Sequence, residues 1–234
     1  MRTLLIIPAY NEEQTLCRLI EDIRTCMPSA DYLVINDCSN DNTKQVLSEI
    51  NASFVNCSIN LGIGGAVQTG YIYAYENGYD IAIQLDGDGQ HDVRFISNMV
   101  SLIENDEADV VIGSRFIDKE GFQSSVSRRM GISFLSGLIR LMCGVRIKDV
   151  TSGFRAVNRP LIELFATEYP DDYPEPEVIV ASYMHGARIE EIPVIMRDRQ
   201  AGHSSINLKK SIYYMIKVSI AIILCRISLG SRQK

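Results

Sequence analysis

The chain has 234 residues, of which 46% are hydrophobic and 22% charged, and its formal net charge is −6. This length and composition suit one sizeable hydrophobic core and exclude an intrinsically disordered chain. The six cysteines lie scattered without C-x-x-C spacing, which argues against a disulfide or zinc framework and favours the reducing cytoplasm. The first residues lead directly into an aliphatic run, so no secretion signal is expected.

Short aliphatic runs alternate with amphipathic segments along the first half of the chain. The runs cover residues 3–7, 32–36, 53–57, 80–85 and 109–112, and the amphipathic segments lie near 12–26, 40–50, 64–77 and 92–104. This alternation predicts an α/β domain with a doubly wound, mostly parallel sheet that helices cover on both faces. Ligands of such sheets bind beyond the carboxyl ends of the strands.

Four polar clusters follow directly after predicted strands. They read PAYNEE, NDCSNDNT, NLGIGG and DGDGQH. Because the carboxyl ends of parallel strands meet at one edge of a sheet, we expect these clusters to converge on one crevice. That convergence is the main argument for an active site.

The cluster DGDGQH predicts a divalent-cation site. Asp86 and Asp88 alternate with glycines after an apolar run, so a tight backbone turn can bring hard oxygen ligands together around Mg²⁺ or Mn²⁺. An isolated D-x-D is more often an ordinary acidic turn, and the other clusters favour the metal interpretation here.

The clusters before it suit a nucleotide. Asp37 is placed to accept a hydrogen bond from a base, while Asn11 and Glu12 also suit a helix cap. Gly62 opens a glycine-rich helix start that allows close approach of an anion. Neither G-x-x-x-x-G-K-[ST] nor an early G-x-G-x-x-G occurs, so ATP hydrolysis and dinucleotide binding lose their best support.

The second half carries a basic region. Residues 115–159 contain nine Lys and Arg against three acidic residues, which indicates an anion site. VSRRMGISFLSGLIRLMCG predicts an amphipathic helix, with Arg128 and Arg140 on a solvated face. Arg155 suits either a structural role or a phosphate ligand.

Seven motifs together carry a family resemblance. They are IIPAYNEE, VINDCSNDNT, NLGIGGAVQTGY, QLDGDGQHD, VIGSRF, DVTSGFRA and EEIPVIMRDRQAGHSS. In this order, over roughly residues 3–206, they resemble the family-2 glycosyltransferases of the polyprenyl (dolichyl) phosphate sugar transferase type, such as the dolichyl-phosphate mannosyltransferases. The resemblance implies a GT-A fold and inverting transfer of a sugar from a nucleotide diphosphate.

The resemblance also implies roles for particular residues. Donor binding falls to Pro8, Tyr10, Glu12, Asp37, Gly62 and Arg199, the metal to Asp86, Asp88 and Gln90, and the acceptor phosphate to Arg115, Arg129 and Ser133. Asn36 departs from the family, many of whose members carry an aspartate there. Arg199 lies in RDRQAGHSS, whose composition suits a loop that closes over the diphosphate.

The nature of the acceptor stays open at this point. A lipid phosphate needs no general base, whereas a sugar hydroxyl needs a carboxylate. YPEPEV offers Glu175 and Glu177, and Glu177 is the predicted catalytic base. The alternatives to a polyprenyl phosphate acceptor are elongation of a lipid-linked polysaccharide and a non-catalytic protein that binds sugar nucleotides.

The end of the chain predicts membrane attachment. We expect a catalytic domain over residues 1–205 and a basic amphipathic tail over 206–234, because residues 197–234 hold eight Lys and Arg against one Asp. A lysine at mid-membrane costs about 2.5–3.5 kcal/mol, so Lys217 disfavours a spanning helix. We expect peripheral binding to the inner face of the cell membrane and no nucleic-acid partner, with a homo-oligomer or a membrane-protein partner through the tail as further options.

Overall fold

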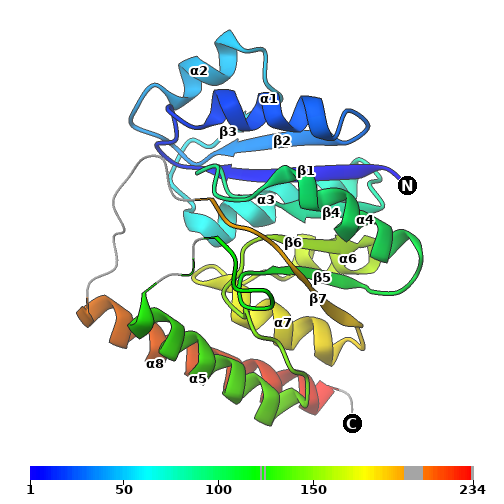
Figure 1. The fold of residues 1–234 in the computed structure, drawn as a ribbon, viewed down its shortest axis with the longest axis vertical. Coiled ribbons are helices and arrows are strands. Elements are labelled where there is room, and N and C mark those ends of the chain that lie inside the picture. The colour runs from blue at the N-terminus through cyan, green and yellow to red at the C-terminus, as the bar shows by residue number, and fades with distance from the viewer. Residues whose placement is uncertain (122, 124, 198–207, 233–234) are drawn as a thin grey trace.

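The structure is a computed structural model that describes residues 1–121, 123, 125–197 and 208–232. Its centre is a seven-stranded sheet in the order β3-β2-β1-β4-β6-β5-β7 (Figure 1). The strands are β1 (Thr3–Ala9), β2 (Asp31–Asn36), β3 (Phe54–Asn56), β4 (Ile81–Gln84), β5 (Val110–Ser114), β6 (Arg155–Asn158) and β7 (Ile189–Pro193).

The first half follows the predicted alternation of strands and helices. The helices α1 (Leu16–Cys26), α2 (Thr43–Glu49), α3 (Gly62–Glu76) and α4 (Ile96–Glu104) separate the first five strands. β1 pairs in parallel with both β2 and β4, so the strand order reverses beside β1. The predicted α/β class and the mostly parallel sheet are therefore confirmed.

Helices cover both faces of the sheet because its strands bury alternate side chains on opposite sides. In β1, Leu5 and Ile7 pack with α1 and α4, whereas Leu4 and Ile6 pack with helices of the other face. Both sets are 0–1% exposed. A strand buried on both faces reads as a continuous apolar run, which is why β1 was recognisable in the sequence.

One strand runs against the others. β6 lies between β4 and β5 and is antiparallel to both, while β7 returns to a parallel pairing with β5. Neither β6 nor β7 stands out in the sequence, because RAVN is short and IEEIP is only partly buried. Because β6 inserts between β4 and β5, the segment after residue 144 returns to the middle of the sheet.

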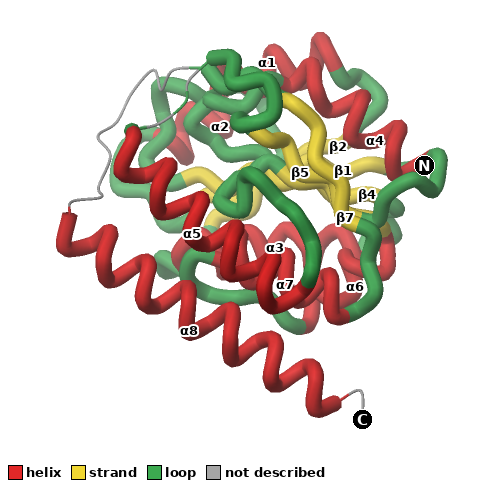
Figure 2. Tube along the Cα trace, turned by 60° about the horizontal axis from the view of Figure 1, so that its bottom comes forward, coloured by secondary structure: helices red, strands yellow, loops and turns green. Residues whose placement is uncertain are grey.

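The second half adds a helical layer. α5 (Val126–Cys143), α6 (Arg159–Thr167), α7 (Pro174–Met184) and α8 (Leu208–Arg232) lie on the same face as α3, and α5 and α8 form its outermost part (Figures 1 and 2). Ser125 caps α5 by accepting from the Arg128 N–H, and Gly144 ends it with φ +80°. In the described part of the chain, no helix is both long and apolar enough to cross a bilayer.

Candidate functional site

Three loops meet at the carboxyl ends of β1, β2 and β4. The Asp37 N–H donates to the Ala9 carbonyl at 2.9 Å, and the Gly87 N–H donates to the Pro8 carbonyl at 3.2 Å. The buried Thr15 hydroxyl joins the start of α1 to the loop after β4, because it donates to the Gly87 carbonyl at 2.7 Å. The polar clusters after these strands therefore share one edge of the sheet, as the sequence predicts.

Asp37 ties the second loop to the start of α3. Its carboxylate accepts from the Leu61 N–H at 2.6 Å and from the Gly62 N–H at 2.9 Å. Gly62 has φ +74°, a conformation that favours glycine. Asp37 thus satisfies backbone donors that an anionic ligand would otherwise use. The nucleoside role of Asp37 and the donor role of Gly62 stay predictions.

Three further residues that the sequence predicts to bind the donor lie at or after the end of β1. Pro8 is buried at the end of β1, whereas Tyr10 is exposed and accepts a hydrogen bond from the Asn40 amide at 3.1 Å. The Glu12 N–H donates to the Thr43 hydroxyl at 2.9 Å, which joins the first helix entry to the second. This contact gives the PAYNEE segment a structural role beside any ligand.

The metal-site candidates form a tight turn after β4. Asp88 accepts from the Gln90 N–H at 3.0 Å, and the Gln90 amide donates to the Arg197 carbonyl at 3.2 Å. Burial raises the pKa of Asp86, His91 opposes the rise, and the negative charge of Asp88 adds to it. A cation between the two carboxylates would relieve this repulsion.

This donor set fits a cation that shares its ligands with a substrate. Within the described ranges, no group of three or more His, Cys, Asp and Glu side chains is placed to hold a metal ion. Asp86 and Asp88 would therefore supply only part of the coordination shell. Mg²⁺ is commonly bound through one or two carboxylates together with phosphate oxygens and water.

His91 supports Asp86 from within the core. The ring stacks on Phe154 with centroids 4.9 Å apart, and its Nδ1 accepts from the Asp86 N–H at 3.1 Å. Its buried Nε2 lies 3.7 Å from Asp86 Oδ2 and has no hydrogen-bond partner among the described residues. His91 therefore acts on the position of Asp86, a role that the motif alone did not indicate.

The TSGF segment before β6 lies against the same carboxylate. A Cβ atom at Gly153 would stand 3.0 Å from Asp86 Oδ1 and 3.0 Å from Gln84 Nε2. Glycine thus leaves room for Asp86 beside the strand. The antiparallel course of β6 makes this contact between distant parts of the sequence.

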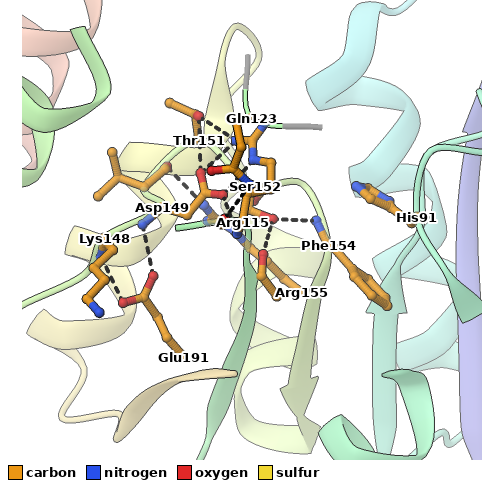
Figure 3. Close-up of polar contacts among 12 residues, drawn as sticks. His91, Arg115, Gln123, Lys148, Asp149, Thr151, Ser152, Phe154, Arg155 and Glu191 are labelled. Carbon is orange, nitrogen blue, oxygen red and sulfur yellow. Dashed lines mark hydrogen bonds and ion pairs between the residues drawn. The ribbon is translucent and has the colours of Figure 1, made fainter. Parts of the chain in front are cut away.

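Arg115 is held by a buried ion pair (Figure 3). Its Nε and Nη2 donate to the two carboxylate oxygens of Asp149, both at 2.6 Å, and Nη2 also donates to Thr151 at 3.1 Å. Arg115 is 5% exposed and Asp149 is fully buried. The carboxylate of Glu191 fixes the loop before Asp149 by accepting from the Lys148 and Asp149 N–H groups.

Arg155 is fixed by backbone carbonyls. Its guanidinium donates to the backbone carbonyls of Ser152, Glu175 and Val150 at 2.7, 2.5 and 3.1 Å. Burial lowers the pKa of Arg155, and the residue is 2% exposed. It joins the TSGF segment to the first turn of α7, which leaves its cationic charge near the site but its donors engaged.

The two glutamates of PEPE face different surroundings. Burial raises the pKa of Glu175, and Arg155 opposes that rise, while Asp86 and Arg128 also act on the same carboxylate. Burial raises the pKa of Glu177 too, but the group that acts on it is Lys217 of α8. The structure therefore brings Glu175 toward Asp86 and Arg115, whereas Glu177, the predicted base, lies toward the outer helix.

The other predicted acceptor residues lie on α5. Arg129 and Ser133 are exposed one turn apart, close to the helix start. Arg199 falls outside the described residues. Besides the role of His91, the sequence did not indicate Asp149 and Glu191, which act through Arg115, and only the approach of β6 and β7 to β5 reveals them.

Comparison with known proteins assigns the chain to a family. The family described as glycosyl transferase family 2 matches residues 4–165. The chain is 29% identical over 216 residues to an undecaprenyl-phosphate mannosyltransferase of Micrococcus luteus, with 88% of each chain covered. It is 26% identical over 228 residues to a polyprenol monophosphomannose synthase of Mycolicibacterium smegmatis, covering 93% of this chain and 86% of that one.

The fold also has solved counterparts. One is the glucosyl-3-phosphoglycerate synthase of Mycobacterium tuberculosis, crystallised with Mn²⁺, uridine diphosphate and phosphoglyceric acid. Its TM-score is 0.71 at 18% identity, and the match covers 96% of this chain and 78% of that one. The family match covers well over half of the sequence, and the chain belongs to glycosyl transferase family 2.

Proposed function

We propose that the protein transfers a sugar, with inversion, from a nucleotide-diphosphate donor to a polyprenyl phosphate at the inner face of the cell membrane. One observation carries the proposal: the paired carboxylates Asp86 and Asp88 lie in the turn that follows the central strand β4, and Arg115 lies within electrostatic reach of Asp86. An acidic metal site and a basic acceptor site thus share one edge of the sheet. The relatives named for undecaprenyl and polyprenol phosphates support the choice of acceptor.

The donor half of the reaction rests on the loops after β1, β2 and β4. Asp37 and Tyr10 would orient the nucleoside, and Asp86 and Asp88, with Gln90, would hold Mg²⁺ or Mn²⁺ against the diphosphate. A bound cation of this kind neutralises charge on a departing nucleoside diphosphate. The Mycobacterium tuberculosis neighbour, crystallised with Mn²⁺ and uridine diphosphate, supports the donor class.

The acceptor half rests on Arg115 and the first turns of α5. Asp149 and Thr151 occupy Nε and Nη2 of Arg115, so its Nη1 is the group that we assign to the acceptor phosphate. Arg129 and Ser133 would complete the phosphate site from α5. A lipid phosphate is ionised near neutral pH, so positioning and charge neutralisation suffice for in-line attack.

A second function is favoured by Glu175. Burial raises the pKa of its carboxyl, and Arg155 and Asp86 both act on it, which supports Glu175 as a proton acceptor near Asp86. A carboxylate there suits a sugar hydroxyl acceptor and hence elongation of a lipid-linked glycan. In that case Glu175 takes the role that the sequence assigned to Glu177.

Product analysis tests the proposal. The protein is incubated with a panel of sugar nucleotides, Mn²⁺ and undecaprenyl phosphate. The molecular mass of the extracted lipid is then measured by mass spectrometry. We expect a gain of one sugar residue on the lipid phosphate. Product formed only on a lipid-linked oligosaccharide would contradict the first function and support the second.

The same assay tests the metal site. We expect Asp88→Ala to reduce turnover at least 100-fold, because charge stabilisation of the leaving group contributes several kcal/mol. Asp80→Ala, an acidic residue before β4 at the opposite end of the strand, is the matched control and should retain activity. Unchanged turnover of Asp88→Ala, or full activity in excess chelator, would refute the metal assignment.

A further inference from the structure

The segment that follows β7 runs from the end of β5 to the turn over residues 86–91, which we call the metal turn. The Val194 N–H donates to the Ser114 carbonyl at the end of β5 at 3.0 Å. Met196 is 7% exposed and forms a single antiparallel bridge with His91 of the metal turn. This short segment therefore packs directly against the turn that carries the predicted metal ligands.

The next residue, Arg197, holds Gln90 at two points. The Arg197 N–H donates to the Gln90 carbonyl at 2.9 Å, and the Arg197 carbonyl accepts from the Gln90 side-chain amide at 3.2 Å. The amide thus presents its NH₂ group to Arg197, and its oxygen lies on the other side of the group. Oxygen is the atom that a hard cation such as Mg²⁺ takes from an amide. Arg197 therefore fixes both the backbone and the side chain of a predicted metal ligand.

The side chain of Arg197 turns toward α1 and toward the residue after the metal turn. Its Nη1 donates to Asp22 Oδ2 of α1 at 2.9 Å, and its Nη2 lies 3.5 Å from Asp92 Oδ1. The backbone of Arg197 thus holds the residue before His91, and its guanidinium faces the residue after it. His91 is the residue that supports Asp86, so Arg197 brackets that support.

The surroundings of these ion pairs allow Arg197 to be removed without unfolding the core. The side chains of Arg197 and Asp22 are 30% and 31% exposed, so Asp22 can be hydrated when its partner is absent. Asp92 is 2% exposed, but it keeps a second cation, because Arg94 Nε donates to both of its carboxylate oxygens at 3.0 Å. Loss of the Arg197 side chain would therefore loosen the metal turn and leave no buried charge unpaired.

We propose that Arg197, held by Asp22, is a positioning residue for the metal turn, and that this ion pair raises the affinity of the turn for its divalent cation. The cation itself rests on the proposed function. Groups that orient metal ligands from outside the coordination shell typically change metal affinity by about 10–100-fold when they are removed. Because Nη1 and Nη2 both face carboxylates, we assign Arg197 to the turn and not to the donor diphosphate.

Manganese binding tests the effect on the cation. Arg197→Ala, Asp22→Asn and the control Glu21→Gln are dialysed to equilibrium against Mn²⁺ and either uridine or guanosine diphosphate, and the excess Mn²⁺ on the protein side is measured. Glu21 is exposed beside Asp22 on α1, so Glu21→Gln removes the same charge from the same helix. We expect Mn²⁺ to bind about tenfold more weakly to Arg197→Ala and Asp22→Asn, and equally well to Glu21→Gln.

The double variant Asp22→Asn with Arg197→Ala tests whether the two residues act as a pair. We expect it to bind Mn²⁺ as weakly as Arg197→Ala alone, because residues that act through one contact give non-additive losses. Losses that multiply in the double variant would contradict the pairing. Circular dichroism confirms that each variant is folded.

Turnover distinguishes positioning from a merely structural role. We expect the Mn²⁺ concentration for half-maximal turnover to rise about tenfold in Arg197→Ala, while kcat at saturating Mn²⁺ stays within about threefold of the unchanged protein. A variant that only contained less folded protein would show the reverse, a lower kcat at an unchanged Mn²⁺ requirement, and that result would overturn the inference.

Hydrogen exchange separates this inference from the proposed function. We expect the amides of the metal turn to exchange faster in Arg197→Ala than in the unchanged protein, with and without Mn²⁺, and those of β4 to exchange equally in both. If the unchanged protein retains no Mn²⁺ but this local difference appears, the metal assignment of the proposed function is refuted, and Arg197 is supported as the residue that holds the turn. Equal exchange and equal Mn²⁺ affinity in Arg197→Ala and the unchanged protein would overturn the inference and leave the proposed function intact.

Discussion

Individual carboxylates in this protein are distinguished by their surroundings more than by their spacing. Glu175 and Glu177 stand two apart in PEPE, yet one is influenced by Asp86 and Arg155 and the other by Lys217. The first turn of α7 causes this difference, because residues two apart on a helix point in different directions. Spacing alone could not have ranked them.

Glu175 should reduce stability at neutral pH. Its pKa is raised in the folded protein by burial, so the folded state holds the proton to a higher pH than the unfolded chain does. Below the ordinary pKa of a glutamate, Glu175 is protonated in both states and does not change the free energy of unfolding. As the pH rises above that pKa, Glu175 lowers the free energy of unfolding. We expect Glu175→Gln to raise the melting temperature at pH 7.5 and to change little at pH 4, measured by calorimetry.

The exposed Glu163 of α6 provides the comparison for that experiment. Glu163→Gln should leave the melting temperature nearly unchanged at both pH values, because an exposed carboxylate keeps its hydration on folding. A lower melting temperature of Glu175→Gln at pH 7.5 would contradict the assignment of Glu175 as a carboxylate that folding desolvates.

The Arg115–Asp149 pair should be costly to break. Both side chains are buried, so Asp149→Ala would leave the guanidinium without its partner, at a cost of about 3–5 kcal/mol in the free energy of unfolding. Glu104→Ala removes an exposed ion pair with the N-terminal amine and should cost about 0–1 kcal/mol. Urea denaturation measures the free energy of unfolding of both variants. Similar losses in the two would show that burial does not determine the stability contributed by the Arg115–Asp149 pair.

Among the secondary-structure elements, the first turn of α3 holds the loops of the candidate site in place. α3 begins where Asp37 receives its N–H groups, and the glycines of NLGIGG let its first turn contact the chain before α7. The Gly64 N–H donates to the Asp171 carbonyl at 3.1 Å. The glycine-rich start therefore serves close packing within the protein as well as any ligand.

Gly64→Ala should destabilise the protein. A Cβ atom there would lie 2.2 Å from the carbonyl oxygens of Pro170 and Asp171, which are backbone atoms and cannot rotate away. Overpacking of this kind costs about 1–3 kcal/mol. Gly137→Ala on α5 meets nothing within 4 Å and should instead stabilise by about 0.5–1 kcal/mol. Thermal melts should therefore show a lower melting temperature for Gly64→Ala and a higher one for Gly137→Ala.

Across the whole molecule, sequence reasoning succeeded where burial is continuous. β1, β2, β4 and β5 read as apolar runs because helices cover both of their faces. β6 and β7 were missed, being short or half exposed, and α7 was hidden by Pro174 and Pro176, which a helix tolerates in its first turn. The contacts of Asp149 and Gly153 depend on β6, so pattern reading could not supply them.

Hydrogen exchange should follow the position of each strand in the sheet. β1 and β4 lie inside the sheet with fully buried side chains, whereas β3 and β7 are its edges and are partly exposed. We expect amides of β1 and β4 to exchange near the rate of global unfolding and those of β3 and β7 to exchange faster. Mass spectrometry of peptic fragments measures the order, and faster exchange in β1 than in β3 would contradict it.

The antiparallel strand β6 also decides whether the first half of the chain, up to the end of β5, can exist alone. β4, which leads into Asp86, bonds to β1 on one side and to β6 on the other, and β6 comes from far along the chain. A fragment ending at Ser114 would leave one edge of β4 unpaired, and such an edge invites pairing with other chains. The half that we propose to bind the nucleotide therefore cannot be detached and reused as a separate module, and any exchange of the proposed acceptor region between relatives must keep this strand.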